Sequence, residues 1–347
     1  MKNLFLQGFI LLFLFFNLTA QDNTNKVKLS GLMFGDAFYN IDNVDITKKD
    51  LNGFQFRRIY ITADYAISDN FEARFRTDAD QSSNSLTPGG KLGVMVKHAY
   101  LKWKGIFSGS DLLFGISPTP TYDISEAAYE YRALEKTIMD LFGIASSSDF
   151  GVDLKGRLDE SGIVNYWVKI ANNSANGPET NKYKRFYLNI QLKPTDKFMA
   201  TIYGDFASQA KKTDPFDNQS KSNNQIVGAV FLNYKQNEDY SIGVESFFRM
   251  IQNNFMKSAT EALQNQNGYG ISVWARGNLS DKVGLVGRFD NFDPNTDNAN
   301  DATSFFLAGV DFKPVKKVSI IPNVELFKYQ GNSGKDLVGR VTFYYQF

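Results

Sequence analysis

The last segment of the chain, from Lys335 to Phe347, alternates between apolar and mostly polar side chains. The apolar parity consists of Leu337, Gly339, Val341, Phe343, Tyr345 and Phe347, and the other of Asp336, Val338, Arg340, Thr342, Tyr344 and Gln346. A period of two places successive side chains on opposite faces of a β-strand. In a closed barrel that crosses a membrane, the apolar parity faces lipid and the polar parity faces the lumen.

The same alternation recurs along the chain, in segments that are separated by gaps of two alternating sizes. The short gaps consist of turn-forming residues and lie near 68–70, 108–111, 159–162, 193–197, 236–239, 280–282 and 313–317. The long gaps are rich in Asn, Ser, Asp, Lys and Gly and lie near 41–53, 81–93, 119–147, 173–183, 209–224, 252–267, 294–302 and 331–334.

Sixteen predicted strands lie between these gaps, and most have the roughly 9–11 residues that a tilted spanning strand needs. They lie near 27–40, 54–67, 70–80, 94–104, 111–118, 148–158, 162–172, 184–193, 197–208, 225–235, 240–251, 268–279, 282–293, 303–313, 317–330 and 335–347. Seven short gaps and eight long gaps between sixteen strands predict an all-β fold. It would be a closed antiparallel transmembrane β-barrel with short periplasmic turns and long outer loops. A soluble β protein is the alternative, but it would expose too much apolar surface.

The N-terminus carries the one continuous apolar run, which follows the basic residue Lys2. We predict a cleaved secretory signal peptide over 1–20 and a single barrel domain over 21–347. An N-terminal anchor helix is the alternative, although the apolar core is shorter than the roughly 20 residues of a spanning helix. The chain has no cysteine, which excludes a lipoprotein anchor, thiolate metal sites and a cysteine nucleophile. Its nearly balanced charge gives no indication of nucleic-acid binding.

Parity also assigns the two faces of each strand. A charge on the lipid face costs about 2–4 kcal/mol near the midplane, so the charged parity must face the lumen. In the segment 184–193, for example, Phe186 and Leu188 oppose Arg185 and Asn189. The segment 225–235 is apolar on both faces, which indicates either a subunit interface or a loop packed inside the barrel.

The long gap 119–147 differs from the other loops because it contains a helical pattern. Asp123 or Ser125 could cap a helix that runs through 126–140 and ends at Gly143. Its apolar stripe needs a surface, and the barrel interior supplies one. We therefore predict that this third outer loop folds into the pore and narrows it. An outward cap or a trimer contact is the alternative.

Several short motifs occur in and around the first six predicted strands. They are Phe56–Arg58, His98–Leu101, Phe114–Pro118, Arg132–Asp140 and Asp149–Val152. Together they resemble the phosphate-selective porin O and P family of Gram-negative outer membranes. The final phenylalanine is also similar to the assembly signal of bacterial outer-membrane proteins. The resemblance implies a sixteen-stranded porin, usually a homotrimer, with the third loop in the pore. Phosphate-specific members share an arginine ladder and a lysine cluster, whereas the lumenal arginines of this chain alternate with acids.

Charged residues of the lumenal parity and of the 119–147 loop are the predicted pore-lining and constriction residues. They are Arg132, Glu130, Glu135 and Lys136 on the loop, and Arg74, Arg76, Arg288, Arg340, Arg276 and Arg58 on the wall. They could set up a transverse field between a basic wall and an acidic loop, which gives a hypothesis of weak anion preference. Alternatively, they could simply form ion pairs that satisfy each other.

Other chemistry has little support in the sequence. His98 is the only histidine and is expected to be an ordinary residue of the pore wall. An outer-membrane hydrolase would need a motif such as Gly-x-Ser-x-Gly, which is missing. The segment 293–301 has oxygen ligands at loose calcium spacing, but a solvated loop is the simpler reading. No catalytic residue, cofactor or metal is expected.

These observations together predict an outer-membrane porin that allows passive diffusion of small hydrophilic solutes and ions. Its partners would be outer-membrane lipid, the solutes or anions that it passes, and two further copies of the chain in a homotrimer. A substrate-specific channel for phosphate or another anion is the first alternative. A non-conducting structural or adhesive barrel is the second.

Overall fold

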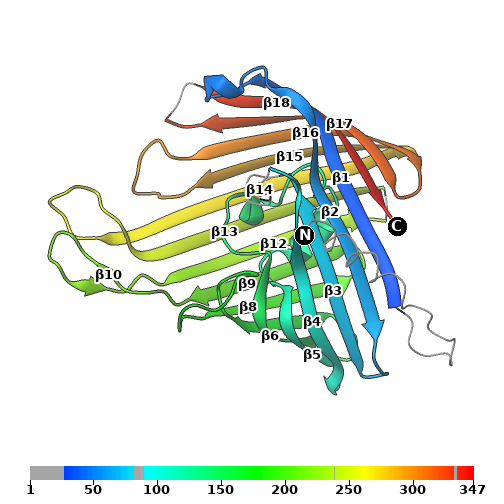
Figure 1. The fold of residues 1–347 in the computed structure, drawn as a ribbon, viewed down its shortest axis with the longest axis horizontal. Helices are drawn as coiled ribbons and strands as arrows, with labels where there is room; N and C mark the ends of the chain where they lie inside the picture. Colours follow the sequence, from blue (N-terminus) through cyan, green and yellow to red (C-terminus); the bar gives the residue numbers. More distant parts are fainter. Residues whose placement is uncertain (1–26, 82–86, 88–89, 238, 332–333) are drawn as a thin grey trace, which may run out of the picture.

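Sixteen antiparallel strands form a closed barrel in the computed structural model, which describes residues 27–81, 87, 90–237, 239–331 and 334–347 (Figure 1). The predicted signal peptide over 1–20 lies outside these residues. The barrel strands are β1 (Val27–Asp42), β2 (Asn52–Ala66), β3 (Phe71–Asp80), β4 (Gly93–Phe107), β5 (Ser110–Pro118), β6 (Ser148–Arg157), β7 (Val164–Ala171), β8 (Arg185–Thr195), β9 (Phe198–Ala207), β12 (Gln225–Gln236), β13 (Tyr240–Phe255), β14 (Gln264–Ser280), β15 (Val283–Asp293), β16 (Thr303–Val315), β17 (Val318–Tyr329) and β18 (Lys335–Gln346). The predicted number of strands and the antiparallel barrel are confirmed.

The outer ends of some strands differ from the prediction. The hairpin of β13 and β14 reaches Phe255 and Gln264, so it is longer than the predicted segments 240–251 and 268–279. The loop between β9 and β12 forms a small unpredicted hairpin of β10 (Lys212–Thr213) and β11 (Ser220–Lys221), which projects beyond the wall in Figure 1. A 3₁₀ turn, η2 (Ile46–Lys48), lies between β1 and β2.

The barrel closes where the first strand meets the last. β1 pairs with β18 from Leu32 opposite Gln346 to Asp42 opposite Leu337. Phe347 extends this pairing, because its backbone N–H and C=O bond with those of Gly31 at 3.0 and 3.1 Å. A Cβ atom at Gly31 would lie 2.5 Å from the Phe347 ring, so the glycine makes room for the terminal aromatic residue.

The two faces of the wall follow the predicted parity. In β8, Phe186 and Leu188 are 49% and 46% exposed on the outer face, whereas Tyr187 and Asn189 are 2% and 3% exposed on the inner face. Many large apolar side chains of the other strands are likewise exposed, such as Phe114, Ile202 and Ile242. Among the residues that the structure describes, no helix combines the length and apolarity needed to cross a bilayer.

Two β-bulges break the parity and turn extra cations inward. In the β1–β2 ladder, Phe34 pairs with Arg58 and Gly35 with Phe56, which leaves Arg57 unpaired. In the β3–β4 ladder, Lys97 is left out in the same way. A bulge opposes two residues to one and re-aims a side chain. Strict alternation therefore missed that Arg57 and Lys97 are interior residues.

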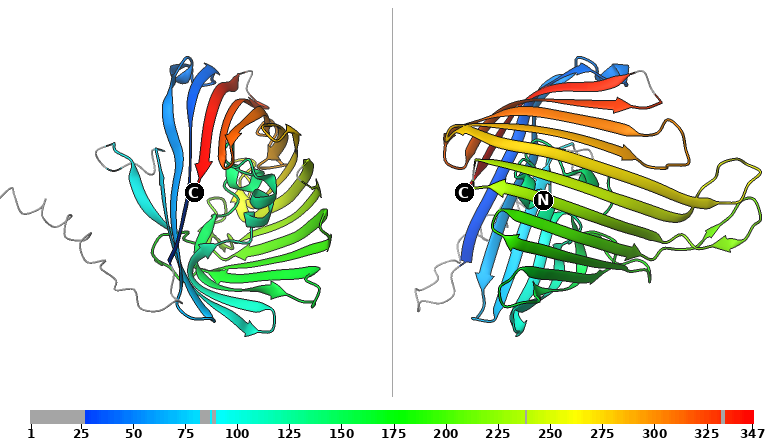
Figure 2. Two further views of the ribbon diagram at one scale, coloured as in Figure 1. Left: turned by 90° about the vertical axis from the view of Figure 1, so that its right-hand side faces the viewer. Right: turned by 180° about the vertical axis from the view of Figure 1, so that it is seen from behind.

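The segment 119–147 contains two short helices, α1 (Asp123–Tyr129) and α2 (Ile138–Leu141), and they lie within the ring of strands in Figure 2. The prediction of one helix through 126–140 is therefore wrong. Glu130 has a φ of 63°, a left-handed conformation that ends α1, and its N–H donates to the Glu126 carbonyl. The predicted caps are also wrong, because Tyr122 takes the N-cap position and makes no side-chain cap bond.

Two apolar clusters hold this segment against the inner wall. In one, Tyr129, Tyr131 and Leu134 pack with wall residues that include Phe231 and Phe305. The other joins Tyr122, Ile138, Met139 and Ile144 to Tyr187, Tyr203, Val227, Phe247 and Phe292. Complete burial of one such side chain contributes about 1.5–3 kcal/mol. The inward apolar residues of β12 thus pack against a loop, which was one of the two explanations for that strand.

Candidate functional site

A narrow cavity of about 60 Å³ separates the 119–147 segment from β2, β3 and β4. The wall contributes three cations to it, Arg58, Arg76 and Lys97, together with Tyr60 and His98. The loop contributes three carboxylates, which are Asp123, Glu126 and Asp140, together with Tyr122 and Ser147, and Pro118 at the end of β5 completes the lining. One bank of the cavity is therefore basic and the other is acidic.

The cations of the wall are held mainly by an aromatic ring and by hydroxyl groups. The Tyr60 ring lies between two guanidinium groups, with the Arg58 and Arg76 carbons 4.7 and 4.9 Å from its centroid. Arg76 donates from Nε to the Thr62 hydroxyl at 2.7 Å, and Lys97 donates to the Ser147 hydroxyl. Within the described part of the chain, the only ion pair of these cations joins Arg58 to Asp78 at 3.6 Å.

The carboxylates of the loop are partly neutralised by one arginine. Arg132 lies 3.0 Å from a Glu126 oxygen and 3.3 Å from an Asp140 oxygen. Asp123 has no ion pair among the described residues. The ion pairs of these groups in the described part of the chain lie within the wall or within the loop and do not cross the cavity. Positive charge therefore faces negative charge across it.

Arginines elsewhere on the wall have close acidic partners. The pairs are Arg74 with Asp64 at 2.6 Å, Arg185 with Asp205 at 2.7 Å, Arg276 with Glu130 at 2.5 Å, Arg340 with Glu325 at 2.7 Å, and Arg288 with Asp290. Both readings from the sequence therefore occur in one barrel. Charges form ion pairs around most of the wall and remain separated at the narrow cavity.

The predicted site residues occupy different parts of the interior. Arg58 and Arg76 line the narrow cavity, and Arg132 lies behind its acidic bank. Arg276 and Glu130 line a cavity of about 760 Å³ on the turn side of the loop. Two further loop residues contact arginines of the wall. The Lys136 carbonyl accepts a hydrogen bond from Arg288, and the Glu135 carboxylate is 4.0 Å from Arg340. Arg74 pairs within the wall, away from the narrow cavity.

The sequence reading missed Lys97 and the three carboxylates of the narrow cavity. A bulge brings Lys97 inward, and no local pattern in the sequence marks a bulge. Asp123, Glu126 and Asp140 were visible as loop acids, but the break after α1 decides which of the loop acids face the wall. Glu130 and Glu135 were the acids chosen, and they lie on other sides of the segment.

The two remaining candidates from the sequence are His98 and the 293–301 loop. His98 is 4% exposed, and its Nδ1 has no hydrogen-bond partner within the described ranges. In the 293–301 loop, Asp293 accepts from the Asn295 backbone N–H at 3.0 Å, which is an ordinary turn contact. In the part of the chain that is described, no group of three or more His, Cys, Asp or Glu residues could hold a metal ion.

Comparison of the sequence with family models and with curated proteins gives no match. The fold is similar to solved outer-membrane channels. The channel DcaP of Acinetobacter baumannii has a TM-score of 0.69 at 14% identity, with 95% of this chain and 99% of that chain covered. An anion-selective porin from Comamonas acidovorans has a TM-score of 0.67 at 8% identity, with 93% and 100% covered. OmpF of Salmonella typhi, in complex with daunomycin, has a TM-score of 0.64 at 13% identity, with 93% and 98% covered.

Proposed function

We propose that this chain is an outer-membrane porin, a passive channel for small hydrophilic solutes and ions with a mild preference for anions. The observation that carries the proposal is the narrow cavity between a basic wall and an acidic loop, inside a closed barrel. The similarity of the fold to porins supports the class, while the solute and the ion preference rest on the chemistry of the cavity.

The outer face of the barrel supports residence in a membrane. Phe54, Ile61, Phe114 and Ile202 are 88%, 54%, 57% and 58% exposed, and each points away from the interior. A soluble protein rarely exposes apolar patches larger than a few hundred Å², and this surface surrounds the whole barrel. Lipid would cover it at no cost, and the closed barrel leaves no strand edge unpaired.

Passage would depend on the charge balance of the narrow cavity. An anion that loses part of its water there would meet the N–H groups of Arg58 and Arg76 and the Lys97 ammonium. Arginine stays charged at any working pH, so the wall keeps its potential. The acidic bank would orient polar solutes across the opening and limit the preference for anions, because three carboxylates face the three cations.

A binding channel for phosphate or another small oxyanion is the second candidate. Arg58 and Arg76 stack on the two sides of the Tyr60 ring, and the hydrogen-bond partner of Arg76 is a hydroxyl and not a carboxylate. A guanidinium edge matches an oxyanion in a bidentate geometry. The motifs that resemble the phosphate-selective porin O and P family support the same idea. A binding channel would show current block by low phosphate, whereas a simple filter would not.

The other parts of the proposal follow from the same class. Export would require the segment 1–20 to act as a cleaved signal peptide, which N-terminal sequencing of the mature protein checks. Assembly as a homotrimer is supported by the trimeric form of the structural neighbour OmpT of Vibrio cholerae. Mass measurement of the native protein in detergent tests it.

Single-channel current in a planar bilayer, with refolded residues 21–347 in a salt gradient, tests the function. We expect open channels and a reversal potential of weakly anionic sign that phosphate leaves unchanged. A reversal potential of cationic sign would refute the anion preference. A folded barrel that never conducts would refute the porin function and would leave the structural or adhesive barrel.

A further inference from the structure

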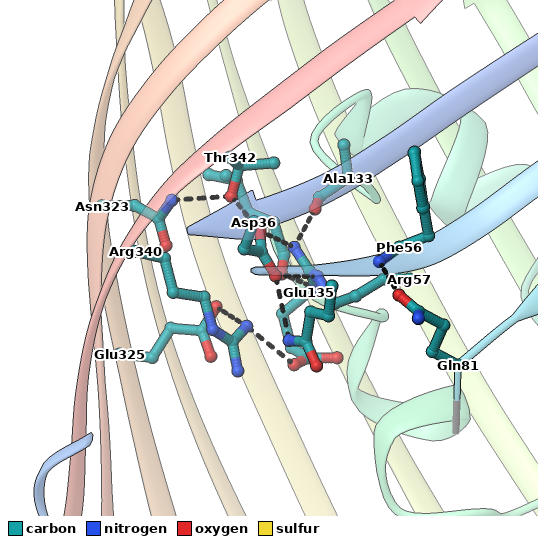
Figure 3. Close-up of polar contacts among 12 residues, drawn as sticks. Asp36, Phe56, Arg57, Gln81, Ala133, Glu135, Asn323, Glu325, Arg340 and Thr342 are labelled. Carbon is teal, nitrogen blue, oxygen red and sulfur yellow. Dashed lines mark hydrogen bonds and ion pairs between the residues drawn. The ribbon is translucent and has the colours of Figure 1, made fainter. Parts of the chain in front are cut away.

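Arg57, the extra residue of the β1–β2 bulge, joins the 119–147 segment to the barrel wall (Figure 3). Its Nη1 donates to the Leu134 carbonyl at 2.6 Å, and its Nη2 donates to the Ala133 carbonyl. Its other side faces Asp36 of β1, with Nε 2.5 Å from Oδ2 and Nη2 3.1 Å from Oδ1. One guanidinium therefore binds two loop carbonyls and one wall carboxylate.

The two carbonyls belong to a part of the loop that needs an external donor. Ala133 and Leu134 lie between α1 and α2, where the chain has left the α-helical conformation and the Leu134 N–H makes a turn bond to the Tyr131 carbonyl at 2.9 Å. Both residues are buried, at 6% and 0% exposed. A buried carbonyl without a donor is costly, so the arginine satisfies groups that this break in the helix creates.

Asp36 links this contact to the place where the barrel closes. The side chain is fully buried, and its Oδ1 also accepts from the Thr342 hydroxyl of β18 at 2.6 Å. Thr342 in turn accepts from Asn323 of β17 at 2.9 Å. The contact therefore depends on strands from both ends of the chain, because Asp36 and Thr342 face each other in the β1–β18 ladder.

Glu135 lies beside the same contact and adds a second charge. Its carboxylate is 4.0 Å from Arg340, which pairs with Glu325 at 2.7 Å. Burial alone would raise the pKa of Glu135, but the charges of Arg57 and Arg340 more than offset it and lower that pKa. Glu135 therefore remains a carboxylate that draws the loop toward the two arginines.

The position of Arg57 in the sequence gives this contact a role at the narrow cavity. The next residue, Arg58, lines that cavity from the wall, and so does Tyr60 on the same strand. The apolar clusters hold the loop against the opposite side, β8 to β17. In the described part of the chain, the hydrogen bonds and ion pairs from β2 to residues 119–147 come from Arg57.

We propose that Arg57 is a positioning residue, which fixes the distance between the 119–147 segment and β2 and thereby sets the width of the narrow passage. The effect on the passage rests on the proposed function, whereas the placement of the loop does not. Asp36 orients the guanidinium, and the closed β1–β18 seam holds Asp36.

The test uses the absence of cysteine from the chain, which makes one introduced thiol a unique reporter. Ala133→Cys places this thiol at a buried position next to Arg57 and changes the side-chain volume little. In that background, Arg57→Ala should raise the rate of modification by a hydrophilic thiol reagent about tenfold, because hydrogen bonds to a charged group are lost. Single-channel recordings of Arg57→Ala should show higher conductance and more open-channel noise.

Arg157→Ala is the matched control, because Arg157 donates to the Glu160 carbonyl and, within the described ranges, has no hydrogen bond or ion pair with residues 119–147. It should leave the modification rate within about twofold of the parent. If Arg57→Ala does not fold to a heat-modifiable barrel, Arg57→Lys is measured in its place. A lysine keeps the charge but has no planar fork, so about threefold faster modification is expected.

Modification at the parental rate in the folded variant would overturn the proposal, whatever the current shows. A barrel that never conducts but shows the expected increase would refute the proposed function and support the role of Arg57. An increase in the Arg157→Ala control as large as that in Arg57→Ala would also overturn the proposal, because it would indicate general loosening of the barrel.

Discussion

The two sides of the barrel interior use their side chains differently. On β8 to β17 the inner face carries large apolar residues, such as Tyr203, Phe247 and Phe305, and the 119–147 segment packs on them. On β2 to β4 the inner face carries Arg58, Arg76 and Lys97, which line the narrow cavity. One side supplies the free energy that holds the loop, and the other supplies the charge that a solute would meet.

The comparison also separates two kinds of arginine. An arginine such as Arg185, whose guanidinium lies 2.7 Å from Asp205, satisfies a buried carboxylate and adds little net potential. Arg76 has a hydroxyl as its hydrogen-bond partner, so its charge remains available to the cavity. The type of residue is the same in both cases, and only the partner decides whether it acts on the structure or on a solute.

The largest effect on the position of the loop is expected from disrupting its apolar contacts with β8 to β17. Ile138→Asp would place a carboxylate at a position that is fully buried within the cluster of Tyr187, Val227 and Phe247. An unpaired charge there costs several kcal/mol, so the loop should leave the wall. We expect protease cleavage within 119–147 and a large rise in conductance, while the heat-modifiable barrel remains.

Ala127→Asp is the control for this experiment, since Ala127 is an exposed residue of α1. It should give neither cleavage nor a rise in conductance. If Ile138→Asp also resisted the protease, the apolar clusters would not be what holds the segment in place.

The next effect concerns the cations that line the narrow cavity. Arg58→Gln with Arg76→Gln removes one charge whose ion-pair partner, Asp78, is 3.6 Å away and one charge whose hydrogen-bond partner is a neutral hydroxyl. A unit charge at about 4 Å contributes about 1 kcal/mol in water, so each loss should lower the anion-to-cation permeability ratio about fivefold. The reversal potential in a salt gradient measures this ratio directly.

A charge-balanced change on the same strands sharpens this comparison. Arg74→Gln with Asp64→Asn removes an ion pair of 2.6 Å and leaves the net charge of the wall unchanged. It should alter the ratio by less than about twofold. Equal effects of the two double variants would mean that pairing does not decide which arginines act on ions.

The acidic bank gives a smaller effect of the same kind. Arg132→Gln would free Glu126 and Asp140 from the guanidinium that they share. The loop side would then become more negative, so we expect the permeability ratio to fall about two- to threefold toward cations. A shift toward anions in the reversal potential would contradict the assignment of these carboxylates to the passage.

The sequence predicted the fold well because each strand obeys a local rule. The alternation in a segment such as 184–193 reflects a wall with one apolar and one polar side, and turn residues mark where each strand ends. Even the doubly apolar segment 225–235 contained the signal of the packed loop, since Val227 and Phe231 point inward.

The site was less predictable because it depends on exceptions to those rules. Arg57 and Lys97 point inward through bulges, which alternation cannot reveal. The helix after Asp123 stops at Glu130, although the sequence continues with good helix formers. Arg57 binds carbonyls exposed by that break, so the local conformation is decided by a residue more than seventy positions away.

The smallest effect concerns acid and the carboxylate of Glu135. Arg57 and Arg340 lower its pKa below the ordinary value of 4.5, against the opposing effect of burial, and the Lys136 backbone N–H donates to it at 2.8 Å. A lowered pKa means that its contribution is present above the ordinary pKa and is lost as the pH falls through the pKa of the folded state. The other charged groups that face Glu135 are Arg132, Asp36 and Glu325.

We expect the thiol of Ala133→Cys to react about two- to threefold faster below about pH 4 than at pH 7, relative to the same reagent on the exposed thiol of Ala127→Cys. Taking the ratio of the two rates cancels the pH dependence of the thiol chemistry itself. The reagent would be a dipyridyl disulfide, because it still reacts with thiols in acid. Glu135→Gln should already show the faster ratio at pH 7 and a flatter pH dependence. If Glu135→Gln kept the full acid response, the Glu135 carboxylate would not be the group that draws the loop toward the two arginines.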